Sequence, residues 1–422
     1  MPGFADIEIM APVGSYESLM AAIQGGAGSV YLGVEHLNMR ARSAANFTLA
    51  DLSKIAQTAS AHNVRSYLTM NTEVFDNETD LMHQILDKAK EAGISAVIAA
   101  DVAVIQYARS IGMEVHISTQ VNITNFEAVR FYAQFADVMV LARETNLGRV
   151  HEISDKIRAY QLKGPSGKLI RLEMFVHGAL CMAVSGKCYL SLHEMNTSAN
   201  RGTCLQTCRR GYTVTDRETG AELAIENEYI MSPKDLKTIH FLNKLLDAGV
   251  SVLKIEGRAR SPEYVKTTVE CYREAVEAWK NNEFTAEKIS LWDARLATVF
   301  NRGFWNGYYL GQRLGEWSHN YGSQATKRKV YIGKLTNYFT NIQVAEFKVE
   351  TGSLKNGDEI LITGPTTGVL EYTAQDIRVA QGPVEEAVKG DYFSLYIPHK
   401  IRKNDKIFKL TDVKNIKENV RI

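Results

Sequence analysis

The feature that most constrains the fold of this chain is the alternation of short apolar runs with helix-like segments over its first 255 residues. Eight runs have strand character: Ile7–Ala11, Val30–Gly33, Ser66–Met70, Ala96–Ala99, Val115–Ser118, Val138–Leu141, Leu172–Val176 and Val252–Ile255. No hairpin signal separates them, so the pattern predicts parallel strands joined by right-handed crossovers. Eight such strands in about 250 residues predict a TIM-like (β/α)8 barrel.

A doubly wound open sheet is the competing interpretation of this alternation. It is less favoured because no Gly-x-Gly-x-x-Gly loop follows the first strand. The segment Tyr264–Trp279 has the periodicity of a long amphipathic helix that would complete the barrel. We therefore assign residues 1–279 to the barrel domain.

The pattern changes near Asn320, where helical periodicity ends. Short alternating runs follow, separated by glycine-containing turns: Val330–Leu335, Ile342–Phe347, Glu359–Ile362, Tyr392–Leu395 and Asp405–Leu410. Residues 322–422 are predicted to form a small antiparallel β-barrel with a tail. Residues 280–321, which are rich in aromatic side chains, are predicted to form a helical bridge between the two domains.

Polar side chains follow almost every predicted barrel strand. Because the carboxyl ends of barrel strands form the active face, these side chains are candidates for one site. The candidate substrate-binding residues are Arg40, Arg42, Asn71, Ser118, Gln120, Arg143 and Arg258. The candidates for proton transfer are Asp101, Glu144, His177 and Glu256. Each residue taken alone is better explained as a structural or solvated group, but converging guanidinium groups as a set would suit a carboxylate or phosphate ligand.

Four of the five cysteines fall in an insertion of about 55 residues, predicted at 178–232, before the last barrel strand. Cys181, Cys188, Cys204 and Cys208 have the spacing Cys-x6-Cys-x15-Cys-x3-Cys. Four thiolates can bind zinc or a [4Fe–4S] cluster, and this spacing matches the usual template of neither, so both remain open. Reduced thiols or two disulfides are the alternatives without a metal. Cys271 lies alone on the predicted long helix and is expected in the core.

The overall charge gives no sign of a polyanionic partner, because 49 Lys and Arg balance 48 Asp and Glu. Any RNA contact would come from local basic groups. The candidates are Arg201, Arg209, Arg210, Lys327, Arg328 and Lys329, together with the lysine-rich stretch 400–409. Neither a signal peptide nor an apolar run of membrane-spanning length is evident, so a cytoplasmic protein is expected.

Two segments around the first cysteines carry a family resemblance. Residues 173–181 read EMFVHGALC and residues 186–191 read GKCYLS. This pattern resembles the signature of the U32 peptidase family of collagenase-like proteins. Further similar segments are APVGS at 11–15, RAR at 40–42, STQVN at 118–122, NRG at 200–202 and KIEGR at 254–258.

The predicted C-terminal β-domain is similar to that of the U32 subgroup involved in hydroxylation of the tRNA wobble uridine. The resemblance implies a tRNA-modifying enzyme that forms 5-hydroxyuridine, with prephenate as a candidate oxygen donor. It also implies a [4Fe–4S] cluster on Cys181, Cys188, Cys204 and Cys208, with zinc as the alternative metal.

The family name also implies a peptidase, which is the alternative function. The sequence contains no Gly-x-Ser-x-Gly, and His193-Glu194 is followed by Thr197 where a zinc-binding helix requires histidine. The second alternative is a scaffold that binds RNA without catalysis.

Overall fold

A closed barrel of eight parallel strands forms the larger part of the molecule. The computed structural model describes residues 7–41, 46–213, 215–220, 231–312, 315–319 and 322–413. The barrel strands pair in sequence order and close through β1–β9 and β7–β9: β1 Glu8–Pro12, β2 Ser29–Leu32, β3 Arg65–Met70, β4 Ala96–Ala99, β5 Glu114–Ile117, β6 Val138–Val140, β7 Arg171–Gly178 and β9 Val250–Ile255. The predicted (β/α)8 barrel is confirmed, and all eight predicted strands overlap these.

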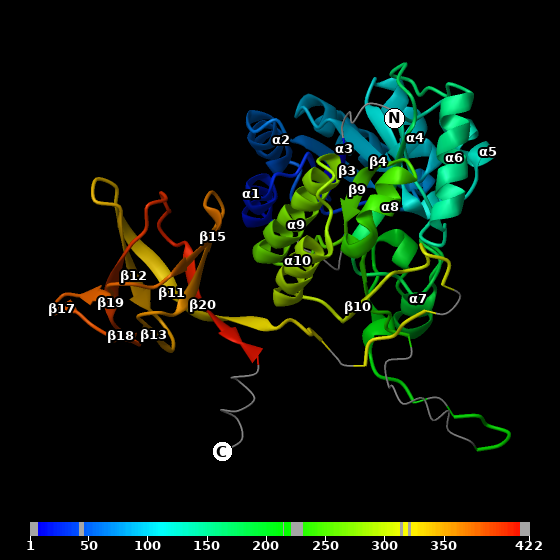
Figure 1. Cartoon of the computed structure of the whole chain (residues 1–422). Helices are drawn as coiled ribbons and strands as arrows, with labels where there is room; N and C mark the ends of the chain where they lie inside the picture. The colour runs from blue at the N-terminus through cyan, green and yellow to red at the C-terminus, as the bar shows by residue number, and fades with distance from the viewer. Residues whose placement is uncertain are drawn as a thin grey trace.

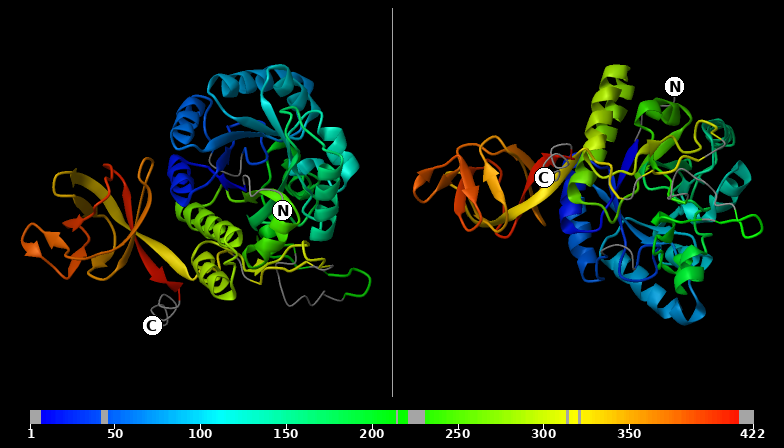
Figure 2. Two further views of the ribbon diagram at one scale, coloured as in Figure 1. Left: turned by 45° about the horizontal axis from the view of Figure 1, so that its top comes forward. Right: turned by 90° about the horizontal axis from the view of Figure 1, so that it is seen from below.

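Helices surround the barrel, as the end-on view of Figure 2 shows. They are α1 Tyr16–Gly25, α2 Asp51–Ala61, α3 Thr79–Glu91, α4 Val102–Ser110, α5 Phe126–Tyr132, α6 Leu147–Ala159, α8 Leu242–Asp247 and α9 Pro262–Lys280. Local sequence sets several of their ends. Ser15, Asn125 and Asn146 accept backbone N–H bonds at the starts of α1, α5 and α6, and Gly26 ends α1 in the left-handed conformation.

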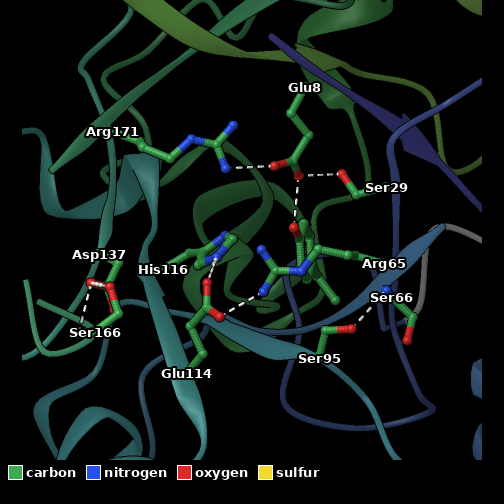
Figure 3. A network of polar contacts seen from close by, with 11 residues as sticks. Glu8, Ser29, Arg65, Ser66, Ser95, Glu114, His116, Asp137, Ser166 and Arg171 are labelled. Carbon is green, nitrogen blue, oxygen red and sulfur yellow. Dashed lines mark hydrogen bonds and ion pairs between the residues drawn. The ribbon is translucent and has the colours of Figure 1, made fainter. Parts of the chain in front are cut away.

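The end of the barrel where the strands begin is closed by a buried polar network, shown in Figure 3. Glu8 is its centre: Ser29 Oγ and Tyr67 OH donate to its carboxylate at 2.6 and 2.7 Å, and Arg171 Nη1 donates at 2.7 Å. Burial alone would raise the pKa of Glu8, but Arg171 and these hydroxyl donors, with His116, lower it to about 2. The Glu8 carboxylate is therefore ionised inside the barrel, where these donors satisfy it.

We expect the Glu8 network to make the barrel sensitive to acid. Since the folded pKa lies below the ordinary value of 4.5, the stabilisation is present above about pH 4.5 and lost as pH falls toward 2. The shift corresponds to about 3 kcal/mol. Urea unfolding should show that Glu8→Gln lowers the free energy of unfolding by about that amount at pH 7, and by less as the pH falls. Glu127→Gln, at an exposed pair with Arg130, is the control and should change little at any pH.

The insertion between β7 and the last barrel strand covers the other end of the barrel. It contains the short helix α7 Leu190–Met195 and the strand β8 Asp235–Lys237, which pairs antiparallel with β7. The predicted bridge contains helix α10 Ala286–Thr298 and strand β10 Phe304–Trp305, and β10 extends the sheet beside β8. The insertion that carries the cysteines is thus held at the mouth where strands β1–β7 and β9 end.

The C-terminal residues form a separate antiparallel β-domain, which lies to the left of the barrel in Figure 1. Its eight-stranded sheet contains β11 Lys327–Phe339, β12 Val344–Val349, β14 Glu359–Gly364, β15 Gly368–Thr373, β16 Arg378–Val379, β17 Gly382–Pro383, β19 Tyr392–Tyr396 and β20 Lys406–Asp412. A second pair joins β13 Ser353–Lys355 to β18 Glu386–Val388. The predicted C-terminal antiparallel β-structure is confirmed.

The β-domain is docked on the outside of the barrel through the turn that joins β14 and β15. Gln24 of α1 donates to the carbonyl of Thr367 at 2.8 Å and accepts from the N–H of Val369 at 2.9 Å. Leu361 and Val369 belong to the same apolar core as the barrel helices. A cleft of about 870 Å³ remains between α9, α10 and the β-domain. In the part of the chain that the structure describes, no helix is both long and apolar enough to cross a lipid bilayer.

Candidate active site at the barrel mouth

A cavity of about 90 Å³ lies at the mouth of the barrel, beneath the insertion. Polar and charged side chains from six different strands or the loops after them line it, together with Cys181 and Cys204. A neighbouring pocket of about 260 Å³ shares Met39, Asn71, Gln120 and Gly186 with it. The mouth is therefore a continuous polar recess at the face where barrel enzymes carry their chemistry.

Glu256, directly after β9, is the carboxylate of this cavity. Arg40 Nη2 lies 3.2 Å from its Oε1, and Tyr31 OH donates to its Oε2 at 3.1 Å. Burial opposes its ionisation, but the guanidinium groups of Arg40, Arg143 and Arg258 lower the pKa of Glu256 below its ordinary value. Glu256 is therefore a proton acceptor and an anchor for Arg40 at neutral pH, rather than an acid.

Arg258 is buried in the wall of the cavity. Its Nη1 donates to Asn38 Oδ1 and Thr69 Oγ1, both at 3.0 Å. Burial lowers the pKa of Arg258 to about 10, so the group remains charged at neutral pH. A Cβ at position 33 would lie 2.2 Å from Arg258 Nη1 and 2.9 Å from Asn38 Oδ1, so Gly33 leaves the space that this contact uses. The glycine that directly follows β2 thus leaves space for the Arg258 guanidinium.

Arg143, in the loop after β6, has hydrogen-bond donors without partners. Its guanidinium carbon lies 4.4 Å from the centre of the Phe175 ring. Its Nε and Nη1 atoms are buried and have no hydrogen-bond partner among the described residues. Buried donors of this kind are costly unless a ligand or water satisfies them. Arg143 is therefore the guanidinium most available to an anionic ligand.

An amide and hydroxyl cluster also lines the cavity. Asn71 Nδ2 donates to Ser118 Oγ at 3.4 Å and to Gln120 Oε1 at 3.3 Å, and Ser118 also donates to Gln120. Asn122 adopts a left-handed conformation and donates to the carbonyl of Ser185 at 3.2 Å. This last bond ties the loop after β5 to the cysteine-bearing insertion.

Lys254, which lines the cavity, forms an ion pair with Glu173 that the strand-end pattern did not identify. Lys254 Nζ lies 2.7 Å from Glu173 Oε1, and both side chains are buried. The ammonium lies 4.8 Å from the Tyr31 ring centre and 5.5 Å from that of Phe175. Period-two alternation could have found Lys254, because it lies two residues before Glu256 on the same inward face.

The four clustered cysteines gather at the same mouth, and none is in a disulfide. Burial raises the pKa of Cys204, with Cys181 and Cys188 adding to the shift. Burial also raises the pKa of Cys208 to about 11, and there the other three clustered thiols add to the shift. Although burial opposes the charge of Arg40, Glu256 and then Cys181 and Cys204 raise its pKa. Four free thiols beside a guanidinium have the donor chemistry of an anionic metal–thiolate centre. Among the described residues, no three His, Cys, Asp or Glu side chains are placed around one common ion position.

Comparison with known proteins identifies the family of this chain. Residues 14–319 match peptidase family U32. The chain belongs to this family. A collagenase from Porphyromonas gingivalis is 61% identical over 404 residues, covering 96% of this chain and 98% of that protein. The tRNA hydroxylation protein P1 of Bacillus subtilis is 31% identical over 392 residues, covering 90% of this chain and 89% of that protein. The solved structure of a U32 peptidase, Mk0906, aligns with 61% of this chain and 96% of the solved chain. The two are 11% identical, with a TM-score of 0.37.

Three of the four proton-transfer candidates of this U32 protein do not line the cavity. Asp101 caps α4 through the N–H of Ala103 at 2.8 Å and borders only the neighbouring pocket. Glu144 is exposed outside the cavity. His177 is enclosed by Tyr264, Tyr272 and Phe304, and burial, with nearby Lys237 and Arg260, lowers its pKa to about 3. The ring of His177 is therefore neutral at pH 7.

The six substrate-binding candidates within the described residues all line the cavity of this U32 protein. These are Arg40, Asn71, Ser118, Gln120, Arg143 and Arg258. The seventh, Arg42, lies outside the described residues. The predicted arginine-rich mouth therefore contains three guanidinium groups in the structure, and Lys254 adds a fourth cation.

The predicted RNA-binding residues of the insertion are divided between structural and exposed groups. Arg209 donates to the carbonyls of Leu180 and Pro233, both at 2.6 Å, and so fastens the insertion to the barrel. Arg201 donates to the Glu73 carbonyl and the Glu78 carboxylate. Arg210 is more exposed, with Glu194 at 3.7 Å.

The basic residues at the start of the β-domain line the cleft between the domains. Lys329 pairs with Glu263 at 2.8 Å and Lys327 pairs with Glu359. Arg328 is exposed and forms no ion pair with a described residue. Acidic neighbours thus neutralise two of these three cations.

Proposed function

We propose that this U32 protein hydroxylates the wobble uridine of tRNA to 5-hydroxyuridine, with a [4Fe–4S] cluster on Cys181, Cys188, Cys204 and Cys208. The observation that carries the proposal is that Cys181 and Cys204 line the same cavity as Arg40, Arg143 and Glu256. A relative of similar length from Bacillus subtilis is named a tRNA hydroxylation protein, which supports the same activity.

The chain's own residues would bind and orient the reactants. A cluster held by the four thiolates would supply electron transfer at the mouth. The donors of Arg143 would bind a carboxylate of a small dicarboxylate oxygen donor such as prephenate. Glu256, ionised and held by Arg40 and Tyr31, would accept the proton that leaves carbon 5 of the uracil ring. Exposed cations such as Arg210 and Arg328 would contact the tRNA backbone in the cytoplasm.

The nucleosides of tRNA provide the direct test of this activity. A bacterial strain that lacks wobble-uridine hydroxylation is complemented with this chain, and its tRNA is digested and analysed by mass spectrometry. We expect 5-hydroxyuridine to return with the wild-type gene and to stay absent with an empty vector. Failure to restore the nucleoside, with the protein expressed and its iron bound, would count against the proposal.

Iron content tests the proposed ligands separately from activity. Anaerobically purified protein should contain about four iron and four sulfide per chain. Cys204→Ala should lower the iron content severalfold, because it removes one of the four proposed thiolate ligands. Cys271→Ala is the matched control, since Cys271 is buried on α9, and should keep the iron of the wild type. Equal iron in both variants would remove Cys204 from the ligand set, and zinc in place of iron would overturn the cluster.

A peptidase is the second candidate, favoured by the 61% identical relative that is named collagenase. Among the residues that the structure describes, the lining of the mouth cavity contains no histidine, so these residues offer no serine–histidine or cysteine–histidine pair of the usual kind. Incubation of the purified protein with denatured collagen tests this function. Cleavage that is lost in Glu256→Gln and Arg143→Ala variants would establish the peptidase at this cavity.

A further inference from the structure

Arg143 and Lys254 line the mouth cavity and lie against the Phe175 ring, and the fully buried Glu173 pairs with Lys254. Arg143 has two buried donors without a partner, and Glu173 Oε2 is buried and also without a partner among the described residues. Lys254 carries three N–H donors, of which its one hydrogen bond to a described residue, with Glu173 Oε1, uses one. A guanidinium and an amine with unused donors therefore line the cavity at one aromatic wall, and a carboxylate with an unused acceptor lies beside the amine.

A purely structural ion pair does not account for this arrangement. Buried pairs are tolerated when the remaining lone pairs and protons are satisfied, and here they are not. The Lys254 end of the pair also borders a cavity rather than a filled core, since Lys254 and Phe175 both line the space. The unsatisfied groups differ in kind: Arg143 offers donors, whereas Glu173 Oε2 offers an acceptor. A ligand that satisfies both needs a carboxylate next to a group that can become a hydroxyl.

We propose that Lys254 forms a covalent imine with a small 2-oxo acid bound in this cavity. Such an acid has a carboxylate, which Arg143 can bind, beside a ketone carbon that the Lys254 amine can attack. The proposal needs no RNA and no metal. It concerns the cavity of the proposed function but not the hydroxylation, and it stands if that function fails.

The ion pair itself handles the proton of this step: Glu173 accepts it from Lys254 and later returns it. The Lys254 ammonium transfers a proton to Glu173 at 2.7 Å, and the free amine attacks the ketone carbon. A nitrogen proton moves to the oxygen to give a neutral carbinolamine, whose hydroxyl can donate to Glu173. Glu173 then returns its proton to that hydroxyl, water leaves, and a protonated imine remains beside the carboxylate. An ammonium and a ketone thus give an iminium and water, with no change of oxidation state.

Reductive trapping tests this inference on the full-length protein. The protein is incubated with pyruvate, reduced with sodium borohydride, and examined by intact mass and peptide mapping. We expect one reduced adduct per chain, located on Lys254. Lys254→Arg should abolish the adduct while keeping the thermal midpoint near that of the wild type, because a guanidinium forms no imine under these conditions. Arg143→Ala should raise the pyruvate concentration for half-labelling by about tenfold or more.

Matched controls make the outcome decisive. Lys88 is exposed and pairs with Glu91 at 2.7 Å, and Lys88→Arg should be labelled like the wild type. An unchanged wild-type mass after trapping, or adducts on other lysines with Lys254 unlabelled, would overturn the proposal. Labelling of Lys254 in a protein that fails to hydroxylate tRNA would support the imine site and reject the proposed function alone.

Discussion

Glu256→Gln should lower the rate of the proposed uridine hydroxylation by about 100-fold or more. The substitution keeps the size of the side chain and removes its charge. Arg40 then loses its charge-assisted bond at 3.2 Å, and the cavity loses the carboxylate that Arg143 and Arg258 stabilise. It also loses the proposed proton acceptor, so both the position of Arg40 and the chemistry are affected.

The rate is measured as 5-hydroxyuridine formed per unit of protein in the complemented strain. Glu144→Gln is the control, since Glu144 is exposed and lies outside the cavity, and it should restore the nucleoside fully. Unfolding curves must show that the Glu256 variant is folded. A folded Glu256→Gln protein that restores normal hydroxylation would remove Glu256 from the machinery.

The barrel could be predicted from sequence because local patterns and topology agree. Each strand is a short buried run, and capped helices separate the runs. The C-terminal domain was harder, and β15 Gly368–Thr373 was missed. Only Val369 among its larger apolar residues is fully buried, because the strand docks on α1 at one end and is exposed at the other. The pattern of buried and exposed residues in β15 therefore depends on a contact between the two domains, which the local sequence does not reveal.

The site was predictable where function follows from strand position. Arg40, Arg143, Glu256 and Arg258 were expected at the mouth and line the cavity. His177 also follows this rule by position, yet Tyr264 and Tyr272 of α9 and Phe304 of β10 enclose it. Those residues come 87 or more positions later in the chain, so the burial of His177 cannot be seen from its neighbours in sequence.

Lys254 and Asp101 show two different limits of reading strand ends. Lys254 lies inside a strand, so the strand-end pattern did not select it, although a buried lysine requires a partner such as Glu173. Asp101 immediately precedes a helix, and its role as N-cap of α4 competes with any catalytic role. In both cases the sequence does not show which partner the charged side chain contacts in the folded protein.

Glu173→Leu should lower the free energy of unfolding by about 3–5 kcal/mol. The substitution leaves Lys254 as a buried ammonium without its carboxylate at 2.7 Å, among the rings of Tyr31 and Phe175. Lys254→Met should be costly for the converse reason. The double variant Glu173→Leu and Lys254→Met replaces both charges with apolar groups, and it should recover most of the stability lost in either single variant.

Urea unfolding of the wild type, both single variants and the double variant measures the coupling between the two charges. The exposed pair Lys88 and Glu91 is the control, and its cycle should give about 1 kcal/mol or less. If Glu173→Leu costs under about 1 kcal/mol, the charge of Lys254 is not confined to the core. Because the double variant also lacks the amine, it separates the two roles of the pair. A stable double variant, beside a wild type that forms the pyruvate adduct, would mean that the barrel keeps this pair for a ligand rather than for its own stability.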